Sequence, residues 1–136
     1  MTTDRASAGL IDTSVLVAVE KGRPLRDEGL PERSAISIVT VAELRAGVLA
    51  APDIESRDRR IVTLEGVRGA TILPIEGKVA RAWAAMRAYL AASERSVSVN
   101  DIWIAATAAT HELPVITQDR DYYVLNGVMG LTVIPV

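Results

Sequence analysis

The stretch 8–17 constrains the fold of this chain more than any other. It begins with a short apolar run, typical of a buried strand, and that run ends at Asp12. Thr13 and Ser14 follow the carboxylate, and the apolar run after them can form a helix. Open α/β sheets place active-site groups in this way, at the carboxyl end of a buried strand and just before a helix. We therefore ask which other carboxylates can reach Asp12.

Further apolar runs predict four more strands, separated by segments with helical spacing. The predicted strands are 35–39, 71–75, 114–117 and 131–134. The predicted helices are 14–20, 40–51, 53–67, 77–94 and 100–112. Pro74 favours an edge or terminal position for its strand. Strands that alternate with helices indicate parallel pairing and a sheet covered on both faces, and we expect a single domain over 1–136.

Composition excludes several classes of protein. The chain has no Cys, which rules out disulfides, thiolate zinc sites and a thiol nucleophile. No apolar run reaches the roughly 18 residues of a membrane helix, and Asp12 interrupts the one segment that resembles a signal peptide. We expect a soluble, cytoplasmic protein with no membrane partner. The formal net charge is −2, so nucleic-acid binding requires a local basic patch or bound cations.

Four acidic residues are positioned to reach one edge of the predicted sheet. Asp12 ends the first strand, and Glu43 lies in the helix after the second. Asp101 begins the helix before the fourth strand, and Asp119 ends that strand. Like charges that converge repel one another and raise each other's pKa. A group of such acids therefore persists where divalent cations neutralise it.

Each of these acids also has a purely structural interpretation. Asp12 can cap the next helix, and Asp101 can be a first-turn acid that the helix dipole favours. Glu43 fits a capping box in which Thr40 is the N-cap. Asp119 can be an ordinary turn residue. No single acid decides between the two interpretations, so the prediction depends on their convergence.

The segments that carry these acids resemble the four motifs of PIN-domain ribonucleases. More narrowly, they resemble the VapC toxins of bacterial toxin–antitoxin pairs. The matching segments are 10–14, 40–44, 100–108 and 115–119. The run Asn-Asp-x-x-Ile-Ala-Ala-Thr-Ala is the most specific of them, and the resemblance extends from residue 9 to residue 134.

The resemblance implies a three-layer α/β/α sandwich with a central, mainly parallel five-stranded sheet. It implies a toxin that is an endoribonuclease with an acidic Mg²⁺ or Mn²⁺ site. The implied catalytic residues are Asp12, Glu43, Asp101 and Asp119, with Asp12 and Asp101 as the surest metal ligands. The fourth acid is the loosest motif position: Asp119 is favoured because it follows Thr117-Gln118, and Asp121 is the alternative. The implied partners are an RNA substrate, a cognate VapB-type antitoxin and a second copy in a homodimer.

A mechanism follows from these groups as a hypothesis. Mg²⁺ prefers hard oxygen ligands and keeps several waters, so Asp12 and Asp101 can hold it together with the scissile phosphate. A water of lowered pKa then attacks in line and leaves a 5′-phosphate and a 3′-hydroxyl. Glu43 and Asp119 complete the shell or orient this water. Hydrogen bonds from neighbouring hydroxyls are expected from Thr13, Ser14 and Thr117.

Competing chemistries fit the sequence less well. A metal-free ribonuclease needs an acid–base pair, often with His, and the only histidine, His111, is far along its helix from Asp101. The chain has no Gly-rich phosphate loop, and neither Lys is placed as in a phosphorelay receiver. A catalytically silent PIN-like binding module and a metal-dependent nuclease acting on DNA stay open. Candidate phosphate contacts near the first two acids are Arg23, Arg26, Arg33 and Arg45.

Overall fold

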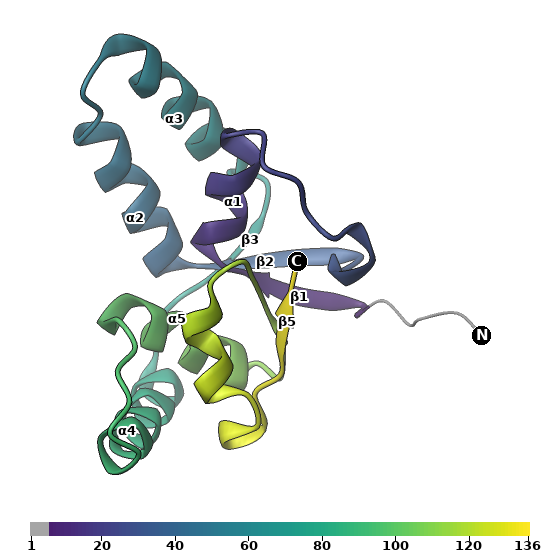
Figure 1. Ribbon diagram of the computed structural model, residues 1–136, viewed down its shortest axis with the longest axis vertical. Coiled ribbons are helices and arrows are strands. Elements are labelled where there is room, and N and C mark those ends of the chain that lie inside the picture. Colours follow the sequence, from purple (N-terminus) through teal and green to yellow (C-terminus); the bar gives the residue numbers. More distant parts are fainter. Residues whose placement is uncertain (1–5) are drawn as a thin grey trace.

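The computed structural model describes residues 6–136 (Figure 1). Its strands are β1 (Ala8–Ile11), β2 (Arg33–Ser37), β3 (Thr71–Leu73), β4 (Val115–Thr117) and β5 (Val133–Pro135). They form one sheet in the order β3-β2-β1-β4-β5, and every neighbouring pair is parallel. This confirms the α/β class and the five-stranded parallel sheet. As expected, the strand with Pro74 just beyond its end lies at an edge. The pairing also places β4 beside β1.

Five helices cover the two faces of this sheet. They are α1 (Thr13–Glu20), α2 (Ile38–Leu49), α3 (Ile54–Gly66), α4 (Gly77–Ala92) and α5 (Val99–Thr110). Helices α1, α2 and α3 lie on one side of the sheet, and α4 and α5 lie on the other (Figure 1). Short 3-10 turns cover Asp27–Gly29, Arg120–Leu125 and Val128–Gly130. Over the described residues, no helix is long and apolar enough to cross a membrane.

Neighbouring residues of the inner strands pack into opposite layers. Leu10 of β1 belongs to the buried cluster that α4 and α5 cover, whereas Ile11 belongs to the cluster under α1, α2 and α3. The same division separates Ala35 from Ile36 in β2, and Val115 from Ile116 in β4. Because side chains alternate across a strand, a sheet that is covered on both faces requires continuous apolar runs. These runs place the strand ends, and the residues that follow them, at one edge.

The boundary between β2 and α2 differs from the prediction. The expected strand 35–39 and helix 40–51 give way to a strand that ends at Ser37 and a helix that begins at Ile38. Ser37 is the N-cap, because its Oγ accepts a hydrogen bond of 3.0 Å from the N–H of Val39. The capping box with Thr40 as N-cap was therefore wrong. Glu43 consequently has no capping role here, which removes the capping interpretation of this residue.

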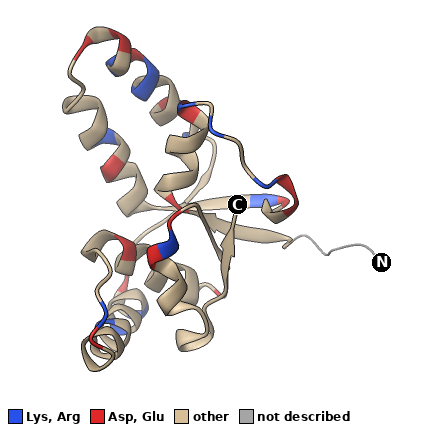
Figure 2. Ribbon diagram, in the orientation of Figure 1, with Lys and Arg blue, Asp and Glu red and all other residues tan. Residues whose placement is uncertain are grey.

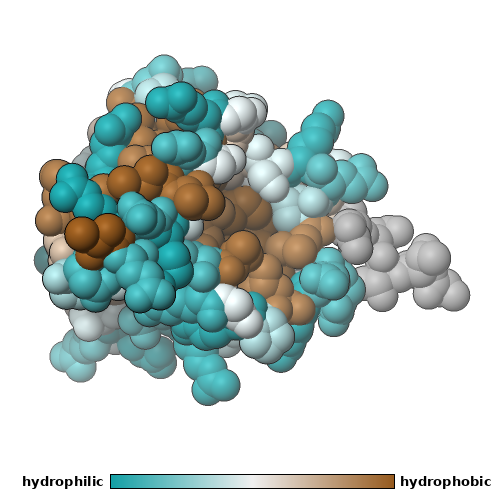
Figure 3. Space-filling model, turned by 90° about the horizontal axis from the view of Figure 1, so that it is seen from above, coloured by the Kyte–Doolittle hydropathy of each residue, from teal (hydrophilic) through white to brown (hydrophobic). Residues whose placement is uncertain are grey.

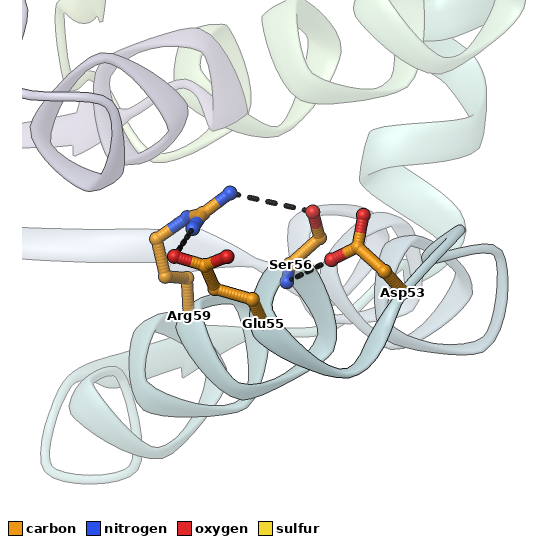
Figure 4. A network of polar contacts seen from close by, with 4 residues as sticks. All are labelled: Asp53, Glu55, Ser56 and Arg59. Carbon is orange, nitrogen blue, oxygen red and sulfur yellow. Dashed lines mark hydrogen bonds and ion pairs between the residues drawn. The ribbon is translucent and has the colours of Figure 1, made fainter.

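The start of α3 is held by exposed local contacts (Figure 4). Oδ1 of Asp53 accepts a 2.7 Å hydrogen bond from the N–H of Ser56, which lowers the pKa of the Asp53 carboxyl below its usual value. Arg59 reaches Ser56 Oγ at 3.3 Å and Glu55 at 3.6 Å. Within 6–136 the Arg59–Glu55 contact is the one ion pair. The arginines near the predicted site therefore form no ion pair with any carboxylate that the structure describes.

Candidate active site

The four predicted acids line one open pocket of about 450 Å³ at the carboxyl edge of the sheet. Acidic segments from separate parts of the chain converge there, where α1 and α2 begin (Figure 2). The remaining lining residues are Thr13, Ser14, Val17, Arg23, Gln118 and Arg120. Asp121, the alternative fourth acid, is exposed and does not line this pocket.

Asp12 is the most buried of these acids, with 2% of its surface exposed. It follows β1 and is the N-cap of α1. Its Oδ2 accepts hydrogen bonds from Ser14 Oγ at 2.6 Å, from Thr117 Oγ1 at 2.9 Å and from the Ser14 N–H at 3.3 Å. A buried carboxylate is costly unless such donors compensate for lost water. The N-terminus of α1 and the two hydroxyls together compensate the Asp12 carboxylate for the hydration that it loses on burial.

The two hydroxyls are themselves oriented by the backbone after β4. The N–H of Gln118 donates to Ser14 Oγ at 3.0 Å, and the N–H of Asp119 donates to Thr117 Oγ1 at 2.9 Å. A hydroxyl has one proton and two lone pairs, so each oxygen that accepts from a backbone N–H is free to donate to Asp12. Because β4 pairs with β1, the hydroxyls of Ser14 and Thr117 both reach Oδ2 of Asp12, and this oxygen has no acceptor position left.

Glu43 lies on α2 across the pocket from Asp12. Thr13 Oγ1 donates to Glu43 Oε1 at 2.7 Å and lies 3.0 Å from Thr40 Oγ1. Asn100 Nδ2 donates to Glu43 Oε2 at 3.4 Å. Three hydrophilic segments that are distant in sequence therefore meet at this carboxylate, and the hydroxyl of Thr13 is a donor as the sequence predicted.

Asp101 lies in the first turn of α5, a helix that Ser98 caps through a 3.2 Å bond from the Asp101 N–H. Burial, and after it the negative charge of Asp12, raise the pKa of the Asp101 carboxyl from 3.8 to about 6, with a smaller contribution from Asp119 and an opposing one from hydrogen bonds with Ser98 and Tyr122. This is the mutual repulsion that the convergence of like charges predicts. The N-terminus of α5 therefore reaches the same edge as the strand ends.

Tyr122 joins the two acids, and sequence reasoning missed it. Its ring is fully buried, and its hydroxyl lies 2.8 Å from Asp12 Oδ1 and 3.1 Å from Asp101 Oδ1. Burial and the two carboxylates raise the pKa of Tyr122 far above its usual range, so the group is a neutral donor. The sequence shows an aromatic residue three positions after Asp119. The geometry of the turn between them could not be predicted, so nothing in the sequence indicated that the Tyr122 hydroxyl points toward Asp12.

Asp119 begins the 3-10 turn Arg120–Leu125. Its Oδ1 accepts a 2.9 Å bond from the N–H of Asp121, so the first of these acids caps the turn that carries the second. The Gln118 side chain binds the backbone: its Nε2 donates to the carbonyls of Pro24 and Val136, each at 3.2 Å. That amide holds the segment after α1 beside the pocket.

Two arginines, Arg23 and Arg120, line the pocket, and neither forms an ion pair with any described residue. The N–H of Arg23 bonds to the Ala18 carbonyl at 2.8 Å in a turn where Gly22 adopts φ 70°. Glycine suits this left-handed conformation, which ends α1 and turns the chain toward the pocket. Arg120 was missed from sequence. The other predicted phosphate contacts, Arg26, Arg33 and Arg45, do not line the pocket.

The donor set fits a hard divalent cation. Asp12 Oδ1 and the Asp101 carboxylate are oxygen ligands of the kind that Mg²⁺ prefers, and their mutual repulsion is relieved by positive charge. Among the described residues, no three His, Cys, Asp or Glu side chains are grouped closely enough to hold one ion between them. One or two carboxylates completed by water and phosphate are a usual arrangement for Mg²⁺.

Comparison with known proteins gives consistent matches. A family model of the PIN domain matches residues 9–128. Ribonuclease VapC5 of Mycobacterium tuberculosis is 48% identical over 130 residues, 96% of each chain. Ribonuclease VapC4 of that organism is 38% identical over 124 residues, 91% of this chain and 95% of the other. A crystal structure of VapBC-5, a member of the VapBC family of toxin–antitoxin systems from M. tuberculosis, superposes with a TM-score of 0.90 at 46% identity and covers 96% of this chain and 99% of that one.

Proposed function

This chain belongs to the PIN-domain family, as a VapC ribonuclease toxin of the type II VapBC toxin–antitoxin systems, and from that premise we propose that its acidic pocket hydrolyses RNA phosphodiester bonds with a divalent cation. Mg²⁺ is the proposed ion, and Mn²⁺ is a substitute. One observation carries the proposal: the carboxylates of Asp12 and Asp101 meet at a single hydroxyl inside a pocket that also contains Glu43 and Asp119.

In the proposed mechanism, Asp12 and Asp101 hold the cation. When bound, Mg²⁺ or Mn²⁺ neutralises charge on the phosphate and lowers the pKa of the attacking water. Glu43 and Asp119 orient that water and accept its proton. The water oxygen bonds to phosphorus as the P–O3′ bond breaks, and the leaving oxygen takes up a proton. The products are a 5′-phosphate and a 3′-hydroxyl.

We propose that Arg23 and Arg120 bind phosphates of the RNA on either side of the acids. A guanidinium binds phosphate through two parallel hydrogen bonds. Both side chains line the pocket without a carboxylate partner within residues 6–136. This local positive charge offsets the formal net charge of −2, which by itself repels nucleic acid.

We further propose that a VapB-type antitoxin binds the groove between α1 and α3. The groove measures about 510 Å³ and is lined mostly by apolar residues, among them Leu16, Val19, Val62 and Val67. Hydrophobic residues gather on the face seen from the α2 and α3 end of the molecule (Figure 3). Exposed apolar grooves are typical of sites that bind an amphipathic helix. A homodimer is also proposed, with the family likeness as its support.

The test of the nuclease proposal is cleavage of total RNA by the purified protein with Mg²⁺. We expect cleavage that EDTA abolishes and that Asp12→Asn and Asp101→Asn each reduce by at least about 100-fold. Asp119→Asn should reduce it strongly, whereas the matched variant Asp121→Asn should not, because Asp121 does not line the pocket. Full activity of Asp12→Asn or Asp101→Asn would refute this site.

Two alternatives are separated by the same assay. A catalytically silent binding module shows no metal-dependent cleavage of any substrate. A nuclease acting on DNA cleaves single- or double-stranded DNA of matched sequence better than RNA. Mapping of the product ends decides the bond that breaks, because 2′,3′-cyclic phosphates would exclude attack by water.

A further inference from the structure

We propose that Tyr122 is a positioning residue that sets the divalent-metal affinity of the pocket by tethering the carboxylates of Asp12 and Asp101. This inference rests on the proposed metal-dependent function and assigns part of it to a residue outside the acid set. Tyr122 lies in the turn that Asp119 begins, and Tyr122 N–H is 3.4 Å from the Asp119 carbonyl. The same turn therefore positions the fourth acid and the tether.

The hydrogen bonds around Asp12 show which of its carboxylate oxygens can still bind a ligand. Its Oδ2 already accepts from three donors, two hydroxyls and a backbone N–H. Among residues 6–136, its Oδ1 accepts from Tyr122 alone, at 2.8 Å. A carboxylate oxygen offers about two lone pairs, so one acceptor position on Oδ1 stays free for a ligand. Tyr122 thus occupies one side of Oδ1 and leaves the other available.

Asp101 depends on Tyr122 more than Asp12 does. Two side chains act on its carboxylate: the Tyr122 hydroxyl, whose one proton is shared with Asp12, lies 3.1 Å from Oδ1, and a side-chain hydrogen bond with Ser98 also lowers the pKa of Asp101. Of the two partners, Tyr122 is the one that also contacts Asp12. Asp101 is also only partly buried, and the charge of Asp12 repels it. Without the hydroxyl, repulsion favours rotamers that turn Asp101 away from Asp12. Binding of a divalent cation would then have to rotate the Asp101 side chain back toward Asp12, which lowers the affinity for the cation.

The expected effect is on metal affinity. Groups that orient a metal ligand typically change affinity by about 10- to 100-fold when they are removed. One hydroxyl shared by two carboxylates falls at the lower end of that range, so we expect Tyr122→Phe to weaken Mn²⁺ binding about tenfold. The Phe ring keeps the buried packing of Tyr122, which belongs to the core under α4 and α5.

Tyr123 provides a matched control. It is the next residue in the same turn, it is 48% exposed, and its hydroxyl has no hydrogen bond to a described residue. Tyr123→Phe removes the same atom from the same turn. A general effect of losing a tyrosine hydroxyl would therefore appear in both variants, whereas tethering appears in Tyr122→Phe alone.

The experiment is a calorimetric titration of the full chain with Mn²⁺, without RNA, together with thermal melts in EDTA. We expect about tenfold weaker binding for Tyr122→Phe and wild-type binding for Tyr123→Phe. RNA cleavage by Tyr122→Phe should recover to near the wild-type rate at saturating Mn²⁺, so the apparent metal constant changes and kcat does not. Tyr122→Met, which also lacks the hydroxyl, repeats the titration if the Phe variant does not fold.

The outcomes separate this inference from the function on which it rests. If wild type and Tyr122→Phe bind Mn²⁺ equally well, the proposed tether is refuted and the proposed nuclease site is not. Wild-type protein that neither binds Mn²⁺ nor cleaves RNA overturns both. A lower melting temperature with unchanged Mn²⁺ affinity would show that Tyr122 only packs, and it would also refute the proposal.

Discussion

Replacing Asp101 with Asn should stabilise the metal-free protein while it removes metal binding. Burial and the charge of Asp12 oppose ionisation of Asp101 and raise its pKa to about 6. Asn is nearly the same size and can still accept the Tyr122 hydroxyl. The backbone bond from residue 101 to Ser98 does not involve the changed group, and the Asn oxygen can still accept the side-chain hydrogen bond that Ser98 makes with the Asp101 carboxylate. The substitution therefore removes a disfavoured charge and little else.

The magnitude follows from the pKa of Asp101. A rise from 3.8 to about 6 is about 2 units, which corresponds to about 3 kcal/mol at neutral pH. Partial exposure screens this effect, and an acid in the first turn of a helix gains about 0.5 kcal/mol that Asn forfeits. We therefore expect the free energy of unfolding to rise by about 1.5 kcal/mol, or Tm by about 4 °C.

The pH dependence of this gain has a definite sign. Because the pKa of Asp101 is higher in the folded state, the folded protein binds the proton more tightly than the unfolded chain does. The contribution of Asp101 to stability therefore falls as the pH rises from about 4 to about 6. The stability difference between Asp101→Asn and wild type should be near zero at about pH 4, grow across this range and level off above it.

Urea unfolding in EDTA between pH 4 and 8 measures this difference. Asp121→Asn is the matched control, and as an exposed substitution it should change stability by no more than about 0.5 kcal/mol. Added Mg²⁺ should stabilise the wild type by ligand linkage and Asp101→Asn hardly at all. A variant less stable than wild type at pH 7 in EDTA, or a difference independent of pH, would refute the repulsion between Asp101 and Asp12.

Three further changes test other parts of the molecule. Ser37→Ala removes the cap of α2 and should lower the free energy of unfolding by about 1 kcal/mol in urea; an unchanged value would contradict the cap. Arg23→Gln should raise KM for RNA about tenfold with little change in kcat, since one charged contact to phosphate is lost; an equal effect on both constants would place Arg23 in the chemical step instead. Val62→Asp, at a position 70% exposed, should weaken antitoxin binding in a pull-down titration and leave RNA cleavage intact; undiminished binding would move the antitoxin elsewhere.

The sequence pattern predicted the sheet well because each inner strand contains consecutive apolar residues. Leu10-Ile11, Ala35-Ile36 and Val115-Ile116 are apolar at both positions, and only a sheet covered on both faces buries such pairs. The end of β2 could not be predicted in this way. Ser37 and Thr40 are both acceptable N-caps, and the chain leaves the sheet at Ser37, where its last pairing partner is Leu73 of the edge strand.

The sequence by itself determined that Asp12 and Asp119 follow strands and that Asp101 lies at the start of a helix, because strand and helix signals are local in the chain. Only the tertiary structure decided that Tyr122 touches both Asp12 and Asp101. Pairing of β1 with β4, with Ile11 opposite Ile116, brings the two strand ends together. The turn after β4 then directs the Tyr122 hydroxyl toward Asp12 and Asp101. Residues 110 apart in sequence meet through strand order and turn geometry, which no local pattern encodes.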